Sequence, residues 1–92
     1  MKVIVKGSFD RDISKVRNKA LRLKLSDKIT QIESAKDISA VTGVKLLRGY
    51  THHYRFPVKT DEESYRIGAI IRGDTIWLVR FLPRKTIYLK FP

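Results

Sequence analysis

Arginine side chains stand next to aromatic ones in the second half of the chain. The clearest cases, in chain order, are Tyr54-Arg55, Tyr65-Arg66, and Arg84 with Tyr88 four residues later. Guanidinium groups bind phosphate oxygens, often in bidentate fashion, and aromatic rings stack on nucleobases. This combination therefore indicates chemistry on a polyanion that carries both phosphates and bases. RNA fits the pattern better than lipid, because a lipid headgroup offers no base to stack on.

The composition of the 92-residue chain points in the same direction. Lysine and arginine number 20 against 9 acidic residues, which gives a formal net charge of +11. Such an excess is self-repelling unless a polyanion meets it, and nucleic acid, an anionic membrane surface and an acidic protein are the three candidates. The absence of cysteine excludes disulfides and cysteine-ligated metal sites, and it is typical of a reducing compartment.

The N-terminal residues indicate where the protein works. The only apolar stretch there runs from Val3 to Val5, which is too short for the core of a signal peptide. No apolar run approaches the length needed to cross a membrane. We therefore expect a cytoplasmic protein that has no membrane partner.

The first third of the chain predicts a strand followed by helical structure. Residues 2–6 alternate in the manner of a strand, Gly7 ends it, and Ser8 is a candidate helix cap. Apolar residues at helical spacing then form two stripes, with Asn18 between them. A hairpin of two helices and one long bent helix both fit. We favour the hairpin because residues 17–20 are the least periodic.

The remainder of the chain predicts mainly strands. Residues 36–49 are typical of a connector, and beyond Gly49 the apolar residues recur at every second position. A polar tip at residues 60–64 and a tight turn at Gly73–Asp74 indicate two successive hairpins. Residues 86–91 are expected to add a last short strand.

Together these elements predict one α+β domain spanning residues 1–92. It consists of an N-terminal strand, a helical hairpin and an antiparallel meander of three to four strands, with the helices covering one face of the sheet. Because side chains alternate between the faces of a strand, Arg55 and Arg66 are expected on the face turned away from the helices. Arg84 and Tyr88 would reach that face from the C-terminal segment. The expected result is a cationic surface with a phenol beside it.

The residues beyond position 44 resemble the C-terminal half of the RelE/ParE superfamily of bacterial toxins. The preceding strand and helical hairpin, including Phe9-Asp10-Arg11-Asp12, fit the same pattern, so the resemblance spans nearly the whole chain. It implies the toxin of a type II toxin–antitoxin system, kept silent by an acidic antitoxin protein. The matching features are Lys45-Leu46-Leu47-Arg48-Gly49, Tyr54-Arg55, Tyr65-Arg66-Ile67, and Arg84 four residues before Tyr88.

Toxins similar to RelE cleave mRNA in the ribosomal decoding site without a metal or other cofactor. The resemblance implies that Arg66 and Arg84 stabilise the charge of the scissile phosphate, while Arg55 holds the flanking phosphates. Tyr88 is implied as the general base, and stacking on a base is an alternative role for it. A free phenol titrates near about 10, so neighbouring cations would have to lower the pKa of Tyr88 for the first role.

The sequence departs from RelE on the first of the two arginine-bearing strands. RelE has a second basic residue two positions beyond the first, and Pro57 stands there in this chain, with Lys59 two positions further on. His52 and His53 would point to opposite faces of a strand, so they do not predict a metal site. The residues that we expect to contact RNA around the catalytic set are Lys59, His53, Arg48, Lys85 and Arg80.

Three functions are open at this stage. A ribosome-associated endoribonuclease is favoured because Arg55, Arg66, Arg84 and Tyr88 occur together. A toxin similar to ParE, which inhibits DNA gyrase, would need a protein-binding surface and no catalytic set. A non-catalytic nucleic-acid-binding module is the third function, since a fold does not fix its function.

Overall fold

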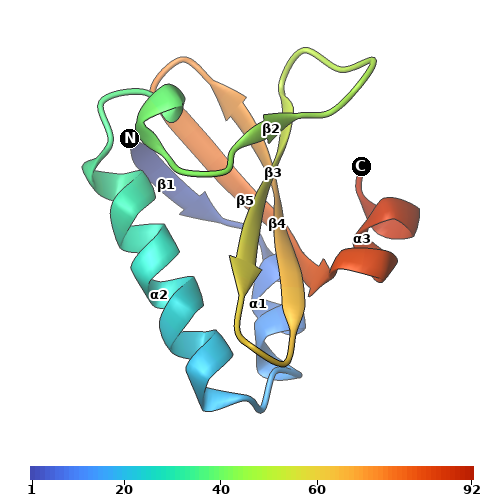
Figure 1. The fold of residues 1–92 in the computed structure, drawn as a ribbon. Helices are drawn as coiled ribbons and strands as arrows, with labels where there is room; N and C mark the ends of the chain where they lie inside the picture. The colour runs from blue at the N-terminus through green and yellow to red at the C-terminus, as the bar shows by residue number, and fades with distance from the viewer.

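The computed structural model describes all residues from Met1 to Pro92. Figure 1 shows a sheet with a long helix, α2, packed along one side and a short C-terminal helix, α3, on the other. No helix is long and apolar enough to cross a membrane. The elements are β1 (Lys2–Val5), α1 (Gly7–Ser14), α2 (Lys19–Ser34), the 3-10 turn η1 (Ile38–Ala40), β2 (Lys45–Leu46), β3 (His53–Lys59), β4 (Ser64–Arg72), β5 (Thr75–Pro83) and α3 (Arg84–Lys90).

The five strands form one mixed sheet in the order β1-β5-β4-β3-β2. β1 pairs with β5 in parallel, and the other neighbours are antiparallel. The predicted α+β class and the three-stranded meander are therefore confirmed. The tight turn between β4 and β5 is also present, with Gly73 at a φ of +59°, a backbone conformation that glycine adopts without steric cost.

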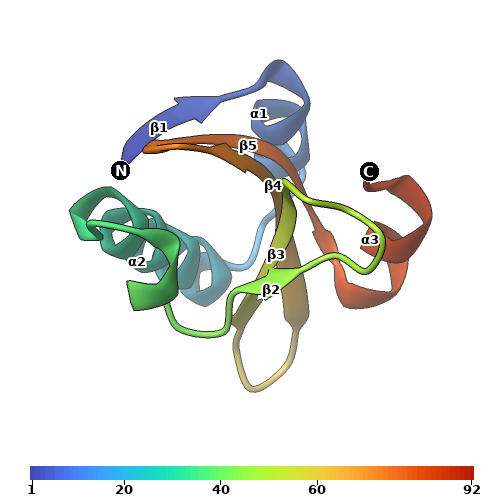
Figure 2. The ribbon, with the colours of Figure 1, turned by 90° about the horizontal axis from the view of Figure 1, so that it is seen from above.

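Each face of the sheet has its own partner. Phe56 and Ile67 point from β3 and β4 into the main core, where both are fully buried. Figure 2 shows the sheet curved around α2, with α3 on the opposite side. Side chains that alternate with the core residues, among them Arg55 and Arg66, consequently lie on the face of α3. The expected separation of the core from the arginines is confirmed.

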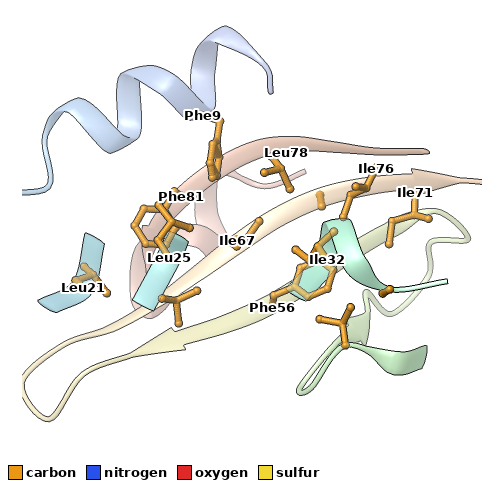
Figure 3. Packing of buried hydrophobic residues seen from close by; sticks show 14 of the residues in the cluster. Phe9, Leu21, Leu25, Ile32, Phe56, Ile67, Ile71, Ile76, Leu78 and Phe81 are labelled. Carbon is orange, nitrogen blue, oxygen red and sulfur yellow. The ribbon is translucent and has the colours of Figure 1, made fainter. Parts of the chain in front are cut away.

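The helical hairpin supplies the other half of the main core. α2 begins after Asn18, whose side-chain oxygen accepts a hydrogen bond from the backbone N–H of Leu21, so the predicted break is confirmed. Phe9 of α1 and Leu21 of α2 are fully buried against the sheet (Figure 3). Burying a side chain of this size stabilises the fold by about 1.5–3 kcal/mol.

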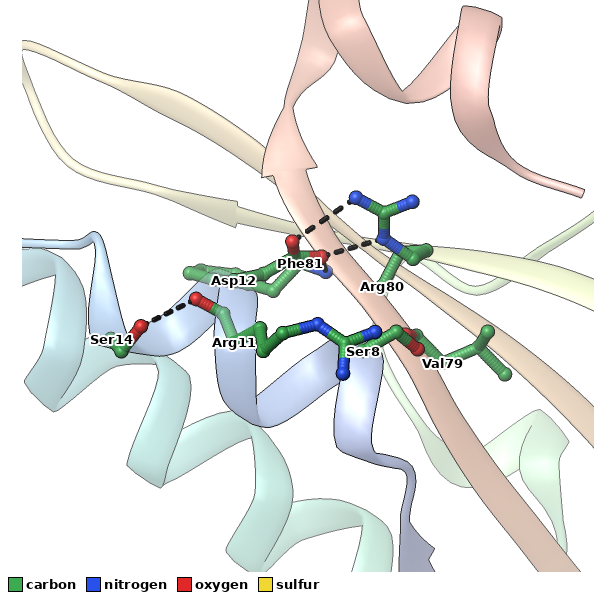
Figure 4. A network of polar contacts seen from close by, with 7 residues as sticks. All are labelled: Ser8, Arg11, Asp12, Ser14, Val79, Arg80 and Phe81. Atoms are coloured by element: carbon green, nitrogen blue, oxygen red, sulfur yellow. Dashed lines mark hydrogen bonds and ion pairs between the residues drawn. The ribbon is translucent and has the colours of Figure 1, made fainter.

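A polar network attaches α1 to an irregular point in β5 (Figure 4). The β4–β5 register shifts so that Val79 is an extra residue in the ladder, and the Ser8 hydroxyl donates to the carbonyl of Val79. The Asp12 carboxylate accepts two bonds from the Arg80 guanidinium, at 2.8 and 3.1 Å, and one from the backbone N–H of Phe81 at 2.9 Å. Polar groups of α1 thus satisfy backbone groups at the bulge.

The expectation of a last strand over residues 86–91 is wrong, because these residues belong largely to α3. Ile87 and Phe91 are four residues apart, which places them on one side of a helix, and both are buried with Leu47 in a small separate cluster. The Phe91 ring lies directly against Gly68 of β4, so close that a Cβ there would be 2.6 Å from the ring. Long-range packing has overridden the strand-like composition of this segment.

Two smaller expectations also need correction. Ser8 does not cap α1: Lys6 occupies the cap position without a side-chain hydrogen bond, and Ser8 lies in the first turn. Residues 36–49 are not wholly a connector, because they contain η1 and the two-residue strand β2. β2 exists only through its pairing with β3, and such pairing cannot be read from two isolated residues.

Replacing Asp12 by alanine should lower the free energy of unfolding by about 2–4 kcal/mol, because the change leaves the Arg80 guanidinium and the Phe81 N–H without an acceptor. Urea denaturation followed by circular dichroism measures this. Asp10→Ala is the matched control, since Asp10 is exposed on the same helix and contributes at most about 1 kcal/mol through the helix dipole. Equal losses in the two variants would contradict the assigned role of the network.

Replacing Gly68 by alanine should lower the free energy of unfolding by about 1–3 kcal/mol, because the added methyl group overlaps the Phe91 ring and α3 must shift. Gly7→Ala is the control, since a Cβ at Gly7 meets only Arg11, at 3.7 Å. Denaturation midpoints of the two variants give the comparison. A Gly68→Ala protein as stable as the parent would show that α3 does not depend on this contact.

Candidate nucleic-acid site

A cationic pocket lies on the sheet face opposite α1 and α2. Its volume is about 250 Å³, and apart from the rings of Pro57 and Tyr88 every side chain that lines it is cationic. Three guanidinium groups, two ammonium groups and one phenol converge there, so the pocket is suited to an anion. The lining residues are Gly43, Lys45, Arg55, Pro57, Lys59, Arg66, Arg84 and Tyr88.

The strands β3 and β4 place two of the arginines. In their register Arg55 is opposite Gly68, and Pro57 is opposite Arg66. Arg55 and Arg66 are therefore diagonal neighbours on one face, a relation that puts Cβ atoms about 7–8 Å apart. Long guanidinium side chains at this separation reach the same bound group.

Helix α3 contributes Arg84 and Tyr88, one helical turn apart. The ring of Tyr88 lies over the Arg55 guanidinium, with 4.6 Å between the guanidinium carbon and the ring centroid. Tyr88 itself is 56% exposed, so its outer face and its hydroxyl group remain accessible. The pocket is consequently assembled from two supports, the β3–β4 pair and α3.

Arg66 is half-buried and held by two local contacts. Its Nη1 donates to the Ser64 hydroxyl and to the Tyr65 carbonyl, both at 3.1 Å. Burial lowers the pKa of Arg66, and the nearby charges of Arg84 and Arg55 add to this effect. Tyr88 acts in the opposite direction. An arginine remains charged at any physiological pH, so the lowered pKa reflects mainly the cost of burying this charge, with a smaller contribution from the two neighbouring arginines.

Arg55 carries unpaired donors. Its Nε and Nη1 are shielded from solvent, and neither has a hydrogen-bond acceptor within the protein. A buried donor that lacks an acceptor costs about 1–3 kcal/mol. The Arg55 guanidinium therefore favours negative charge nearby, both on a ligand and on the phenol above it.

The phenol of Tyr88 is shifted toward ionisation. Its pKa lies below the ordinary value, chiefly because the Arg55 guanidinium is placed to donate to the phenol oxygen, and Arg84 adds a smaller contribution of the same sign. Tyr65, on the core side of β4, has a raised pKa because of burial and the charge of Glu63. The sequence required neighbouring cations to lower the pKa of Tyr88 if this residue is to act as a base. The structure places such cations next to it.

Of the five residues predicted to contact RNA around the catalytic set, the structure places some at the cationic pocket and others away from it. Lys59 lines the pocket, and Lys85 lines a shallow hollow with Arg84 next to it. His53 lies on β3 two residues before Arg55, outside the pocket lining, and Arg48 is exposed on the loop between β2 and β3. The structure does not bring Arg80 to the pocket, since its guanidinium is paired with Asp12.

Two lining residues were not predicted to belong to the site, although Lys45 begins one of the motifs that carry the family resemblance. Lys45 pairs with Arg55 through the β2–β3 ladder, and this edge pairing has no local signal. Gly43 has a φ of +79° and lies so close to Pro57 that a Cβ would be 2.7 Å from its ring.

The chemistry available in this pocket follows from its donors. Guanidinium and ammonium groups bind phosphate oxygens, and guanidinium groups can stabilise the negative charge that develops on those oxygens during a reaction. A phenol with a lowered pKa can accept a proton or stack on a base. No three histidine, aspartate or glutamate side chains are gathered where they could hold a metal ion.

Comparison with known proteins places the chain among toxins. No protein-family model matches it. A protein named Toxin RelE3, from Methanocaldococcus jannaschii, is 32% identical over 93 residues, and the alignment covers 100% of both chains. A chain in the crystal structure of a RelB-RelE antitoxin-toxin complex from Methanococcus jannaschii has 28% identity and a TM-score of 0.74, and the match covers 97% of this chain and 99% of that one.

Tyr88 should ionise below the ordinary phenol value of about 10, and Tyr65 above it, because cations stabilise the first phenolate and burial disfavours the second. Phenolate absorbance followed against pH, in the parent and in Tyr88→Phe, isolates the Tyr88 component. Arg55→Gln should move that component to higher pH. A Tyr88 component at or above the ordinary value in the parent would contradict the electrostatic description of the pocket.

Proposed function

This chain belongs to the RelE family of toxins, and from that membership we propose that it is a cytoplasmic endoribonuclease that cleaves mRNA on the ribosome. It would act as the toxin of a toxin–antitoxin pair. The observation that carries the proposal is the convergence of Arg55, Arg66, Arg84 and Tyr88 on one pocket of about 250 Å³. A toxin that only blocked another protein would not require three guanidinium groups around a phenol.

The proposed reaction is transesterification within the RNA backbone. The ribose 2′-oxygen attacks the adjacent phosphorus, and the bond from phosphorus to the 5′-oxygen of the next nucleotide breaks. The 2′-hydroxyl gives its proton to a base, and the leaving 5′-oxygen takes up a proton from water. The products are a 2′,3′-cyclic phosphate, which can open to a 3′-phosphate, and a 5′-hydroxyl.

Each side chain has a role in this scheme. Negative charge builds on the phosphoryl oxygens in the transition state, where Arg66 and Arg84 would stabilise it. Arg55 would hold a flanking phosphate and keep the pKa of Tyr88 low, so that Tyr88 accepts the 2′-hydroxyl proton. The positive charge comes from side chains, so the scheme is independent of a metal ion.

The second partner that we propose is an acidic antitoxin. The net charge of +11 provides the attraction, and the related chain of known structure was solved in a complex with RelB antitoxin. A segment that folds on binding could cover the cationic pocket and keep the toxin silent. Its removal would free the pocket for RNA.

The proposal is tested by mapping mRNA 3′ ends in a translating extract to which the purified protein has been added. New 3′ ends that arise only when ribosomes are present are the expected result. Cleavage of naked RNA would mean an unassisted ribonuclease. Loss of DNA supercoiling without cleavage would mean a gyrase-directed toxin, and neither effect would mean a non-catalytic module.

In the same assay Arg66→Ala should lower the cleavage rate by about 10²- to 10³-fold, the usual cost of removing one donor that stabilises transition-state charge. Arg72→Ala is the matched control, because Arg72 ends the same strand but lies outside the pocket lining. Both variants should unfold near the parent's midpoint. Cleavage by Arg66→Ala at the parent's rate would remove Arg66 from the catalytic set.

A further inference from the structure

A row of three aromatic rings begins at the edge of the cationic pocket. The ring of His53 lies between those of Tyr50 and Phe91, with centroid distances of 4.8 and 5.7 Å. Phe91 is buried and His53 is half-buried, whereas Tyr50 is 44% exposed. The row therefore ends in a ring that presents part of its surface to solvent.

The row is continuous with the pocket. His53 precedes Arg55 by two residues on β3, which puts both side chains on one face about 7 Å apart. Phe91 follows Tyr88 by three residues, and these two rings lie against neighbouring parts of the sheet, Phe91 on Gly68 and Tyr88 on Arg55. An RNA strand that left the pocket past Arg55 would reach the aromatic row at His53. The separation of Arg55 and His53 is comparable with the length of one nucleotide.

The loop that carries Tyr50 is braced rather than loose. The backbone N–H of Leu47 donates to the His53 carbonyl at 2.8 Å, and the N–H of Tyr50 donates to the Leu47 carbonyl at 3.1 Å. On the other side, the N–H of Ile71 donates to the His52 carbonyl at 2.9 Å. A loop whose backbone is fixed in this way loses little conformational freedom when a flat ligand stacks on the ring that it carries.

Folding explains two of the three rings and leaves the third unexplained. Phe91 anchors α3, and His53 packs beneath it. Tyr50 belongs to neither hydrophobic cluster, and its hydroxyl makes no hydrogen bond in the structure. An exposed aromatic ring beside a phosphate-binding surface is the arrangement that single-stranded nucleic acids use for base stacking.

We propose that Tyr50, supported from beneath by His53, is a stacking subsite for the nucleobase of the nucleotide next to the scissile phosphate in single-stranded RNA. This inference rests on the proposed function. Arg48, exposed on the same loop, supplies a cation for the phosphate of that nucleotide. Because every base has an aromatic face, the subsite adds affinity and register without selecting a particular base.

The test measures binding and leaves cleavage out of the readout. The probe is a fluorescent single-stranded RNA octamer with a 2′-O-methyl group at every position, which blocks the attacking hydroxyl, and its affinity is measured by anisotropy at one fixed salt concentration. A set of such octamers carries a single abasic site at each position in turn. The proteins are the parent, Tyr50→Ala, Tyr50→Phe, and Leu23→Ala as control, because Leu23 is 64% exposed on α2.

Tyr50→Ala should weaken binding of the intact octamer by about 5- to 150-fold, the range for loss of one base–aromatic stack, while Tyr50→Phe and Leu23→Ala bind as the parent does. One abasic position should weaken binding to the parent by a similar factor and have no further effect on Tyr50→Ala. If Tyr50→Ala binds every octamer as the parent does, the subsite is refuted. The proposed function is not affected by that result, because it is tested by cleavage in the translating extract. Failure of the parent to bind any octamer would also refute this inference, whereas failure to cleave mRNA in the extract would overturn the proposed function.

Discussion

Three guanidinium groups gathered in one pocket repel one another, and the rest of the structure holds them there against that repulsion. Like charges that share one pocket raise the free energy of the folded protein. Arg55 and Arg66 keep their positions because the opposite face of the same two strands carries Phe56 and Ile67, which are fully buried. Each of these burials contributes about 1.5–3 kcal/mol, so the main core is what makes the charge cluster sustainable.

The features that the sequence predicted correctly are those encoded locally. A period of two along β3 and β4 determines which side chains share a face, so the placement of Arg55 and Arg66 on the face opposite α1 and α2 followed from the residues alone. Asn18 marks the break between the helices because its own side chain satisfies a free N–H group three residues later. The α+β class followed from the same local periods, and from a family resemblance that spans nearly the whole chain.

The features that the sequence did not predict depend on residues far apart in the chain. Residues 86–91 carry strand-forming side chains, but Gly68 offers a site where a helix can place Phe91. Lys45 reaches the pocket only through pairing with β3. Arg80 was expected to contact RNA, and its guanidinium is instead paired with Asp12, 68 positions earlier. In each case a single tertiary contact outweighs the local pattern.

The attachment of α3 through its own small cluster, apart from the main core, has a consequence for the evolution of such a chain. Ile87 and Phe91 hold this helix with Leu47, while Arg84 and Tyr88 on its other positions make few demands on folding. The residues of α3 that line the pocket and the residues that attach α3 to the sheet are therefore largely different sets. Substitutions at the two pocket-lining positions of this helix are thus compatible with an unchanged fold, so this part of the chain can vary in sequence without loss of its architecture.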